Sequence, residues 1–175
     1  MKTQEQSLSE IGQSAYESIK EMVEAADCDY DRLEEMREER EDWVDNVGGD
    51  DDEQDRSNEE WAKEFPDEAG ELANLETEAG DCEDQDDAEQ RITDDPLSLQ
   101  FRSGWYSQGD TPTTEEFELL LSTGGPATRI IGRIEDGEPV SARLQAQDWG
   151  TPWTEYLDAD QDVLLSYCRR FYFGE

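Results

Sequence analysis

Apolar residues recur at a helical period through the first half of the chain. Steps of three and four residues between apolar positions predict a helix over 8–26, with Ser7 or Ser9 as its N-cap. A second helix is predicted over 29–47, because two glycines follow directly and end it. We expect these two helices to pack as an antiparallel hairpin. Shorter helices are predicted over 57–65 and 66–80, with one further turn over 88–92.

The period changes to two at Leu97, where apolar and polar residues begin to alternate as they do in strands. Glycine-containing turns at 124–126 and 136–137 separate the later strands, which predicts an antiparallel meander. A last helix is predicted after Asp158 or Asp160, either of which is placed to cap it, and it is expected to cover the open face of the sheet. The predicted strands lie over 97–101, 117–121, 129–134 and 140–146.

These elements predict an α+β protein in two regions. Residues 1–93 are expected to form an acidic helical region, and residues 94–175 an antiparallel sheet of about four strands with a C-terminal helix. Sixteen Trp, Tyr and Phe residues favour folded cores despite the high charge of the chain.

Charge is distributed unevenly between these two regions. Residues 1–93 hold 34 of the 49 carboxylates against 8 basic residues, and the whole chain carries −35. Such a charge opposes compaction by self-repulsion, so a function is expected to favour it. Duplex DNA has one charge per about 1.7 Å of axis, so 35 carboxylates match the phosphates of roughly 60 Å of duplex. The charge therefore predicts a protein that imitates a nucleic acid.

Several kinds of chemistry are disfavoured by what the sequence lacks. The chain has no histidine, and it has no phosphate-binding, hydrolase or zinc-protease motif, so we expect neither an enzyme nor a cofactor. Asp27 begins a calcium-like spacing, but Arg32 stands where the loop needs glycine, so no metal site is expected. Three widely spaced cysteines are typical of free thiols in a reducing compartment. The chain has no long apolar run, so we expect a soluble, cytoplasmic protein with no membrane contact.

The best candidates for a partner-binding site are carboxylates that a helix holds in fixed positions, because a rigid surface loses less entropy on docking. The expected partner is a basic nucleic-acid-binding protein, and direct binding to nucleic acid is not expected because the chain repels phosphate. The predicted helix over 29–47 provides six such carboxylates, and the following loop provides a flexible extension of three more. These candidates are Glu34, Glu35, Glu38, Glu41, Asp42, Asp45, Asp50, Asp51 and Asp52.

The acidity is also compatible with two functions that do not involve mimicry. A protein of a high-salt cytoplasm has an acidic surface as well, and 3 lysines against 11 arginines fits that alternative. The second alternative is an acidic interaction or scaffold protein of unrelated function. Concentration of the charge in one half favours mimicry, because adaptation to salt is expected to spread charge over every exposed face. For Arg129, Arg133 and Arg143, salt bridges to the acidic half and contacts with a partner are both open.

The helix-borne acids of 29–47, together with the acidic runs at 50–56 and 81–89, resemble the DNA-mimic inhibitors of phages and plasmids. That resemblance implies binding to, and inhibition of, a host defence protein such as a restriction enzyme or a CRISPR complex. The C-terminal half resembles small uncharacterised proteins of bacterial phages and mobile elements, which implies no known activity. Its matching segments are RSGWY at 102–106, TGGPA at 123–127 and QDWGTPWTEY at 147–156.

Overall fold

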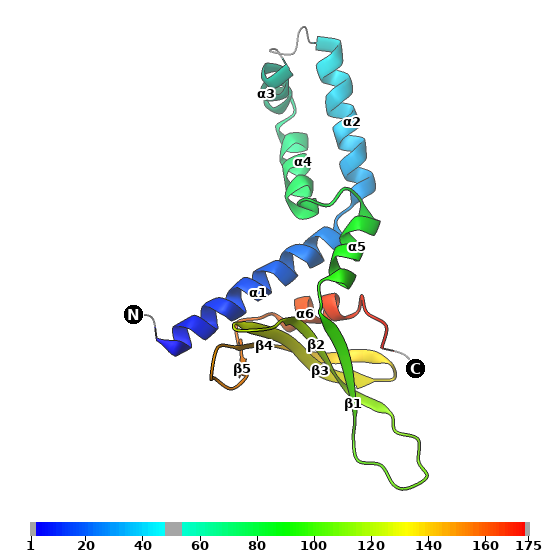
Figure 1. The fold of residues 1–175 in the computed structure, drawn as a ribbon. Helices are drawn as coiled ribbons and strands as arrows, with labels where there is room; N and C mark the ends of the chain where they lie inside the picture. The colour runs from blue at the N-terminus through cyan, green and yellow to red at the C-terminus, as the bar shows by residue number, and fades with distance from the viewer. Residues whose placement is uncertain (1–2, 48–53, 174–175) are drawn as a thin grey trace. The chain divides into compact units, whose positions relative to one another are not determined.

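The structure is a computed structural model that describes residues 3–47 and 54–173, and it confirms the α+β class. The first half contains the helices α1 (Gln4–Asp27), α2 (Tyr30–Val47), α3 (Gln54–Glu64), α4 (Pro66–Ala79) and α5 (Gln85–Asp94). The second half contains the strands β1 (Ser98–Ser103), β2 (Thr114–Ser122), β3 (Ala127–Glu135), β4 (Glu138–Gln147) and β5 (Thr154–Glu155), followed by helix α6 (Gln161–Cys168) (Figure 1).

The chain forms two compact units. Glu24–Ala88, here called the acidic unit, has 29 acidic and 5 basic residues, a net charge of −24. Met1–Val23 together with Glu89–Glu175, here called the sheet unit, has 20 acidic and 9 basic residues, a net charge of −11. The predicted domain boundary at residue 93 stays a prediction. In the structure, residues 1–23 belong to the same compact unit as the sheet. The excess of acid is thus concentrated in one compact unit.

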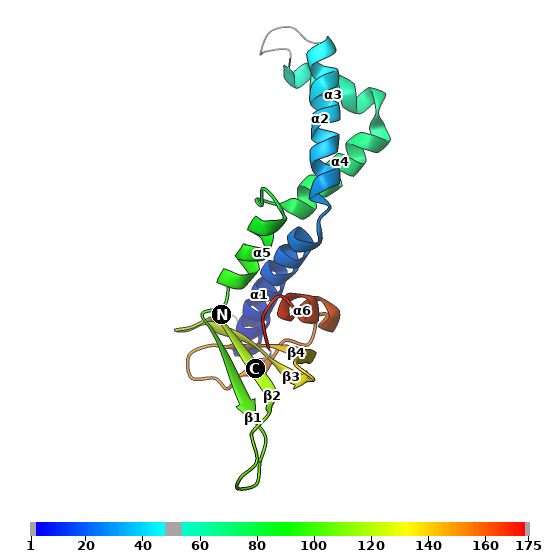
Figure 2. The ribbon, with the colours of Figure 1, turned by 90° about the vertical axis from the view of Figure 1, so that its right-hand side faces the viewer.

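The sheet is an antiparallel meander in the order β1-β2-β3-β4-β5, as predicted, with the two-residue β5 added at one edge. Its core face is built from aligned rows, one of which pairs Leu119 with Ile130 and Ile130 with Leu144, all fully buried. Both α1 and α6 lie over this face, as Figures 1 and 2 show. The prediction that the last helix covers the open face of the sheet is therefore confirmed, and α1 shares that role.

Polar side chains fix where several helices begin. The N–H of Gln6 donates to Thr3 Oγ1 (3.3 Å) and the N–H of Thr3 donates to Gln6 Oε1 (2.9 Å), so a capping box starts α1. The predicted caps at Ser7 and Ser9 are wrong, because the helix begins one turn earlier. Asp160 caps α6 as predicted, accepting from the N–H of Asp162 (2.8 Å).

In the acidic unit, α2 packs against α3 and α4 (Figure 2). The predicted antiparallel pairing of the helices over 8–26 and 29–47 is therefore wrong. Each helix has an apolar side, but the two sides are buried in different cores. Trp61 and Phe65 pack with ring centroids 6.0 Å apart, and the Trp43 ring meets the Phe65 ring edge-on at 6.2 Å. The buried core of this cluster consists of Cys28, Leu33, Met36, Trp61, Leu72 and Ala79.

The helix α5 has ten residues, whereas one turn was predicted. Asp84 caps it by accepting a hydrogen bond from the N–H of Asp87 (2.8 Å). The spacing of three residues between these two acids is a capping signal in the sequence. The side-chain amide of Gln85 donates to the carbonyl of Ala26 (2.6 Å). This bond joins the two ends of the acidic unit and favours the helical conformation of the first turn of α5.

Candidate functional site

One side of α2 carries an unbroken row of carboxylates. Five of the six predicted α2 residues share this side, directly opposite the side on which Met36 and Trp43 pack. All five side chains are exposed. We call this row the acidic stripe, and it consists of Glu34, Glu38, Glu41, Asp42 and Asp45.

The arginines of α2 point away from the stripe and bind α4. Arg32 Nε lies 2.9 Å from Glu71 Oε1, and Arg37 and Arg40 approach Glu76 Oε1 at 3.6 and 3.8 Å. The hydrogen bonds between Arg32 and Glu71 lower the pKa of Glu71 and raise the pKa of Arg32. The cations of α2 are thereby engaged with α4 and do not neutralise the stripe.

Glu35, the sixth predicted residue of α2, belongs to this arginine network. Its Oε2 accepts from Arg32 Nη1 at 2.7 Å. In contrast, none of the five stripe carboxylates has an ion-pair partner among the residues that the structure describes. Sequence periodicity predicts that all six acids are exposed, as the structure shows. It did not separate Glu35 from the others, although the i,i+3 spacing of Arg32 and Glu35 is a local signal that could have done so. Asp50, Asp51 and Asp52 lie outside the described residues.

The spacing of the stripe resembles that of a phosphate backbone. Eleven residues separate Glu34 from Asp45, which is about 16.5 Å of helix axis at about 1.5 Å per residue. Five carboxylates over this length give one charge per about 4 Å, against about 3.4 Å per phosphate for one strand of duplex DNA. The linear charge density of the stripe is thus within about a fifth of that of a DNA strand.

Holding these carboxylates together has a cost. Three pairs in the stripe are spaced i,i+4, and like charges at that spacing oppose helix formation by about 0.2–0.5 kcal/mol each, or about 1 kcal/mol together. Burial of Leu33 and Met36, which are 1% and 0% exposed, contributes about 1.5–3 kcal/mol each. Packing therefore outweighs the repulsion and holds the helix that carries the carboxylates.

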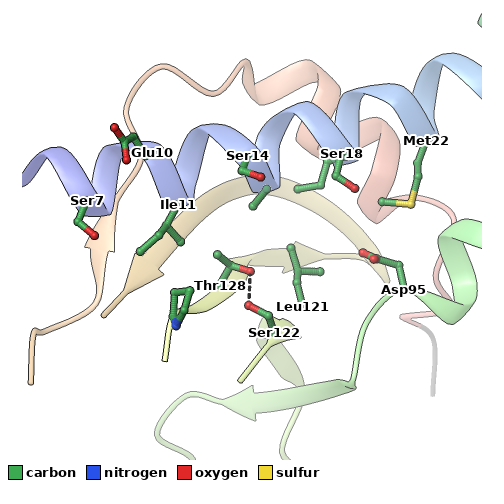
Figure 3. Close-up of a pocket in the computed structure, with 13 residues that line it drawn as sticks. Ser7, Glu10, Ile11, Ser14, Ser18, Met22, Asp95, Leu121, Ser122 and Thr128 are labelled. Atoms are coloured by element: carbon green, nitrogen blue, oxygen red, sulfur yellow. Dashed lines mark hydrogen bonds between the residues drawn. The ribbon is translucent and has the colours of Figure 1, made fainter. Parts of the chain in front are cut away.

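A second feature lies in the sheet unit, where a cavity of about 500 Å³ separates α1 from the ends of β2 and β3. Figure 3 shows Ile11 projecting from α1 toward the sheet and Leu121 projecting toward α1. Hydroxyls line much of the rest, and Ser122 Oγ and Thr128 Oγ1 are hydrogen-bonded at 2.9 Å. None of the lining residues is a lysine or arginine, so the cavity offers no cation to an anionic ligand.

Asp95 lines one end of this cavity and accepts a hydrogen bond from Tyr167 Oη at 2.5 Å. Burial, and then the bond to Asp95, raise the pKa of Tyr167, so its hydroxyl stays protonated and holds the carboxylate in place. Sequence reasoning missed the cavity because its walls come from segments far apart in the chain, with no local motif.

Arginines on the opposite face of the sheet are paired within the sheet. Arg129 Nη1 lies 2.5 Å from Glu118 Oε2, and its guanidinium stacks 4.2 Å from the centroid of the Trp153 ring. Arg143 Nη1 lies 3.6 Å from Glu155 Oε2. The salt bridges of these arginines are therefore with glutamates of the sheet, and not with the acidic half as one of the two interpretations predicts.

Within the described ranges, no three Cys, Asp or Glu side chains gather in an arrangement that holds a metal ion. No helix in the described part of the chain has the length and apolar character needed to cross a bilayer. Comparison with protein-family models, curated proteins and solved structures finds no match to this chain.

Proposed function

We propose that this protein is a nucleic-acid mimic that binds a basic nucleic-acid-binding protein, such as a restriction enzyme or a CRISPR complex, and inhibits it. In this proposal the acidic stripe of α2 occupies the groove that normally holds a phosphate backbone. The proposal rests on one observation: the average axial spacing of five exposed carboxylates on one helix side is close to that of phosphates in a DNA strand.

Two further features support it. The arginines of α2 are engaged by Glu71 and Glu76, and none of them forms an ion pair with the stripe. The stripe also lies on a helix packed against a buried core, which limits the entropy lost on docking. Binding is expected to be fast and to weaken as salt screens the opposing charges.

The test has two stages. The protein is used to capture a nucleic-acid-binding protein from its host, and displacement of fluorescent duplex DNA from that captured protein is then measured. A stripe variant carries E34Q, E38Q, E41Q, D42N and D45N. A control variant loses the same five charges at exposed acids of the sheet unit: E5Q, E21Q, D136N, E138Q and D158N.

We expect the stripe variant to displace DNA at least about tenfold less well than the control variant, because it lacks the charges that replace phosphate. The unchanged protein should displace DNA less well as salt rises. Equal performance of the two five-charge variants would show that total charge, and not the stripe, is responsible. Simultaneous binding of DNA and this protein to the captured partner would contradict mimicry.

A further inference from the structure

The strand β1 forms an edge of the sheet, so one row of its backbone amide and carbonyl groups has no strand partner in the described part of the chain. Such an edge is a template for another strand, and proteins usually protect it with charges, proline or a very short length. The opposite edge follows this rule, because β5 has two residues and the part of β4 beyond it carries Glu138, Pro139 and Arg143. In contrast, β1 has six, and its irregularity lies at its end, between Arg102 and Ser103.

The residues along this edge are apolar on the core side and almost uncharged. Leu97 is 59% exposed and Phe101 is 49% exposed, although both continue the side of the sheet that carries Phe117. No acidic residue occurs from Leu97 to Gly109, and Arg102 is the one charged residue there. In a chain with a charge of −35, this edge therefore lacks the carboxylates that would repel a second copy.

We propose that β1 pairs with β1 of a second copy about a two-fold axis, which joins the two sheets into one. The register that keeps the pairing within the regular part of the strand, 98–102, places Gln100 opposite Gln100 of the second copy. Leu99 then lies opposite Phe101, twice, and Arg102 lies opposite Ser98, so no like charges face each other. Leu97 reaches Phe101 of the second copy as a diagonal neighbour.

This self-association does not depend on the mimicry proposed above. The two also respond to salt in opposite directions. Two copies repel through their net charge, so salt that screens this repulsion strengthens the dimer. The same salt weakens binding to a basic partner. A pair of short strands buries less than the roughly 1,200 Å² of a typical stable interface, so the dimer is weak and concentration-dependent.

Substitutions at Gln100 test the register, because this side chain is exposed on the face away from the helices. Q100E and Q100K each place like charges opposite each other, whereas a mixture of the two places opposite charges there. The same two substitutions at Gln161, which is exposed on α6, are the matched controls. Sedimentation velocity over a range of protein concentrations, at about 0.05 M and about 0.5 M salt, gives the dimer fraction.

We expect the unchanged protein and the Gln161 variants to dimerise more at the higher salt. Q100E alone and Q100K alone should dimerise several-fold more weakly, and their equimolar mixture should recover or exceed the original dimer fraction. A protein that stays monomeric at the highest concentration in high salt overturns the proposal. A dimer that is indifferent to both Gln100 substitutions also overturns it, since it must then use another surface.

Discussion

At the scale of single residues, the hydroxyl of Tyr167 links α6 to the segment that leads into the sheet. The side chain is fully buried, and its hydrogen bond to Asp95 is made inside the sheet unit. Asp95 is half-buried, so its carboxylate is only partly solvated when it loses this donor, and the bond matters more than one between exposed groups.

Replacement of Tyr167 with Phe should lower the free energy of unfolding by about 1–2 kcal/mol at neutral pH. Because folding raises the pKa of Tyr167, the stability that this group contributes is present below about pH 10, the ordinary pKa of tyrosine. That contribution falls as pH rises above about 10, where the unfolded chain ionises and the folded one does not. Urea unfolding between neutral and alkaline pH should therefore show a smaller alkaline loss in Y167F.

The control for this substitution is Y106F, which removes a hydroxyl that is exposed to solvent in the loop between β1 and β2. Its unfolding curve should coincide with that of the unchanged protein within about 0.5 kcal/mol. An alkaline loss of stability that is identical in Y167F and the unchanged protein would assign the loss to other groups, such as the buried Cys168 thiol, whose pKa burial also raises.

At the scale of secondary-structure elements, close approach of neighbouring strands depends on Gly132. In register it lies between Phe117 on β2 and Ala142 on β4. A Cβ at this position would lie 1.9 Å from the carbonyl oxygen of Ser141 and 2.5 Å from the Phe117 ring. The backbone oxygen cannot move away without disturbing the ladder between β3 and β4.

We therefore expect Gly132→Ala to destabilise the sheet unit by roughly 2–4 kcal/mol. Gly70 provides the contrast: it lies within α4, is exposed, and has no atom within 4 Å of the added Cβ. Gly70→Ala should stabilise the protein by about 0.5–1 kcal/mol, because alanine favours the helix. Thermal unfolding followed by circular dichroism measures both, and a neutral Gly132→Ala would show that strand spacing does not require glycine.

The elements themselves were largely predictable, whereas their partners were not. Alternation such as Phe117, Leu119 and Leu121 reports directly that one side of a strand is buried, so the strands were found from sequence. An apolar stripe reports only that a helix side is buried and says nothing about which core buries it. For this reason the sequence did not reveal that α1 covers the sheet or that α2 packs on α4.

The same limit applies to the candidate site. Exposure of the stripe follows from the 3.6-residue period, because its residues lie opposite Met36 and Trp43. The salt bridge between Arg32 and Glu71 joins residues far apart in the chain, so local pattern cannot predict that Glu71 binds an arginine of α2.

At the scale of the whole molecule, the fold should persist at low ionic strength. Both units contain buried apolar cores, and the screening length grows from about 10 Å at 0.1 M salt to about 30 Å at 0.01 M. Added repulsion should lower the melting temperature without removing the cooperative transition. Circular dichroism of the protein dialysed into dilute buffer tests this expectation, and loss of structure on dialysis would favour adaptation to a high-salt cytoplasm.

In topological terms, the acidic unit is an insertion: the chain leaves the sheet unit after Val23 and rejoins it at Glu89. The bond between Gln85 and Ala26 fastens the two ends of this insertion together. Closing a flexible loop as long as the insertion costs about 2 kcal/mol more in entropy than closing a loop of about five residues. An acidic unit that folds first therefore acts as a tether. Like a crosslink, it keeps α1 close to the chain that forms the sheet and so favours their contact. In a growing chain, all residues of the acidic unit are synthesised before those of β1.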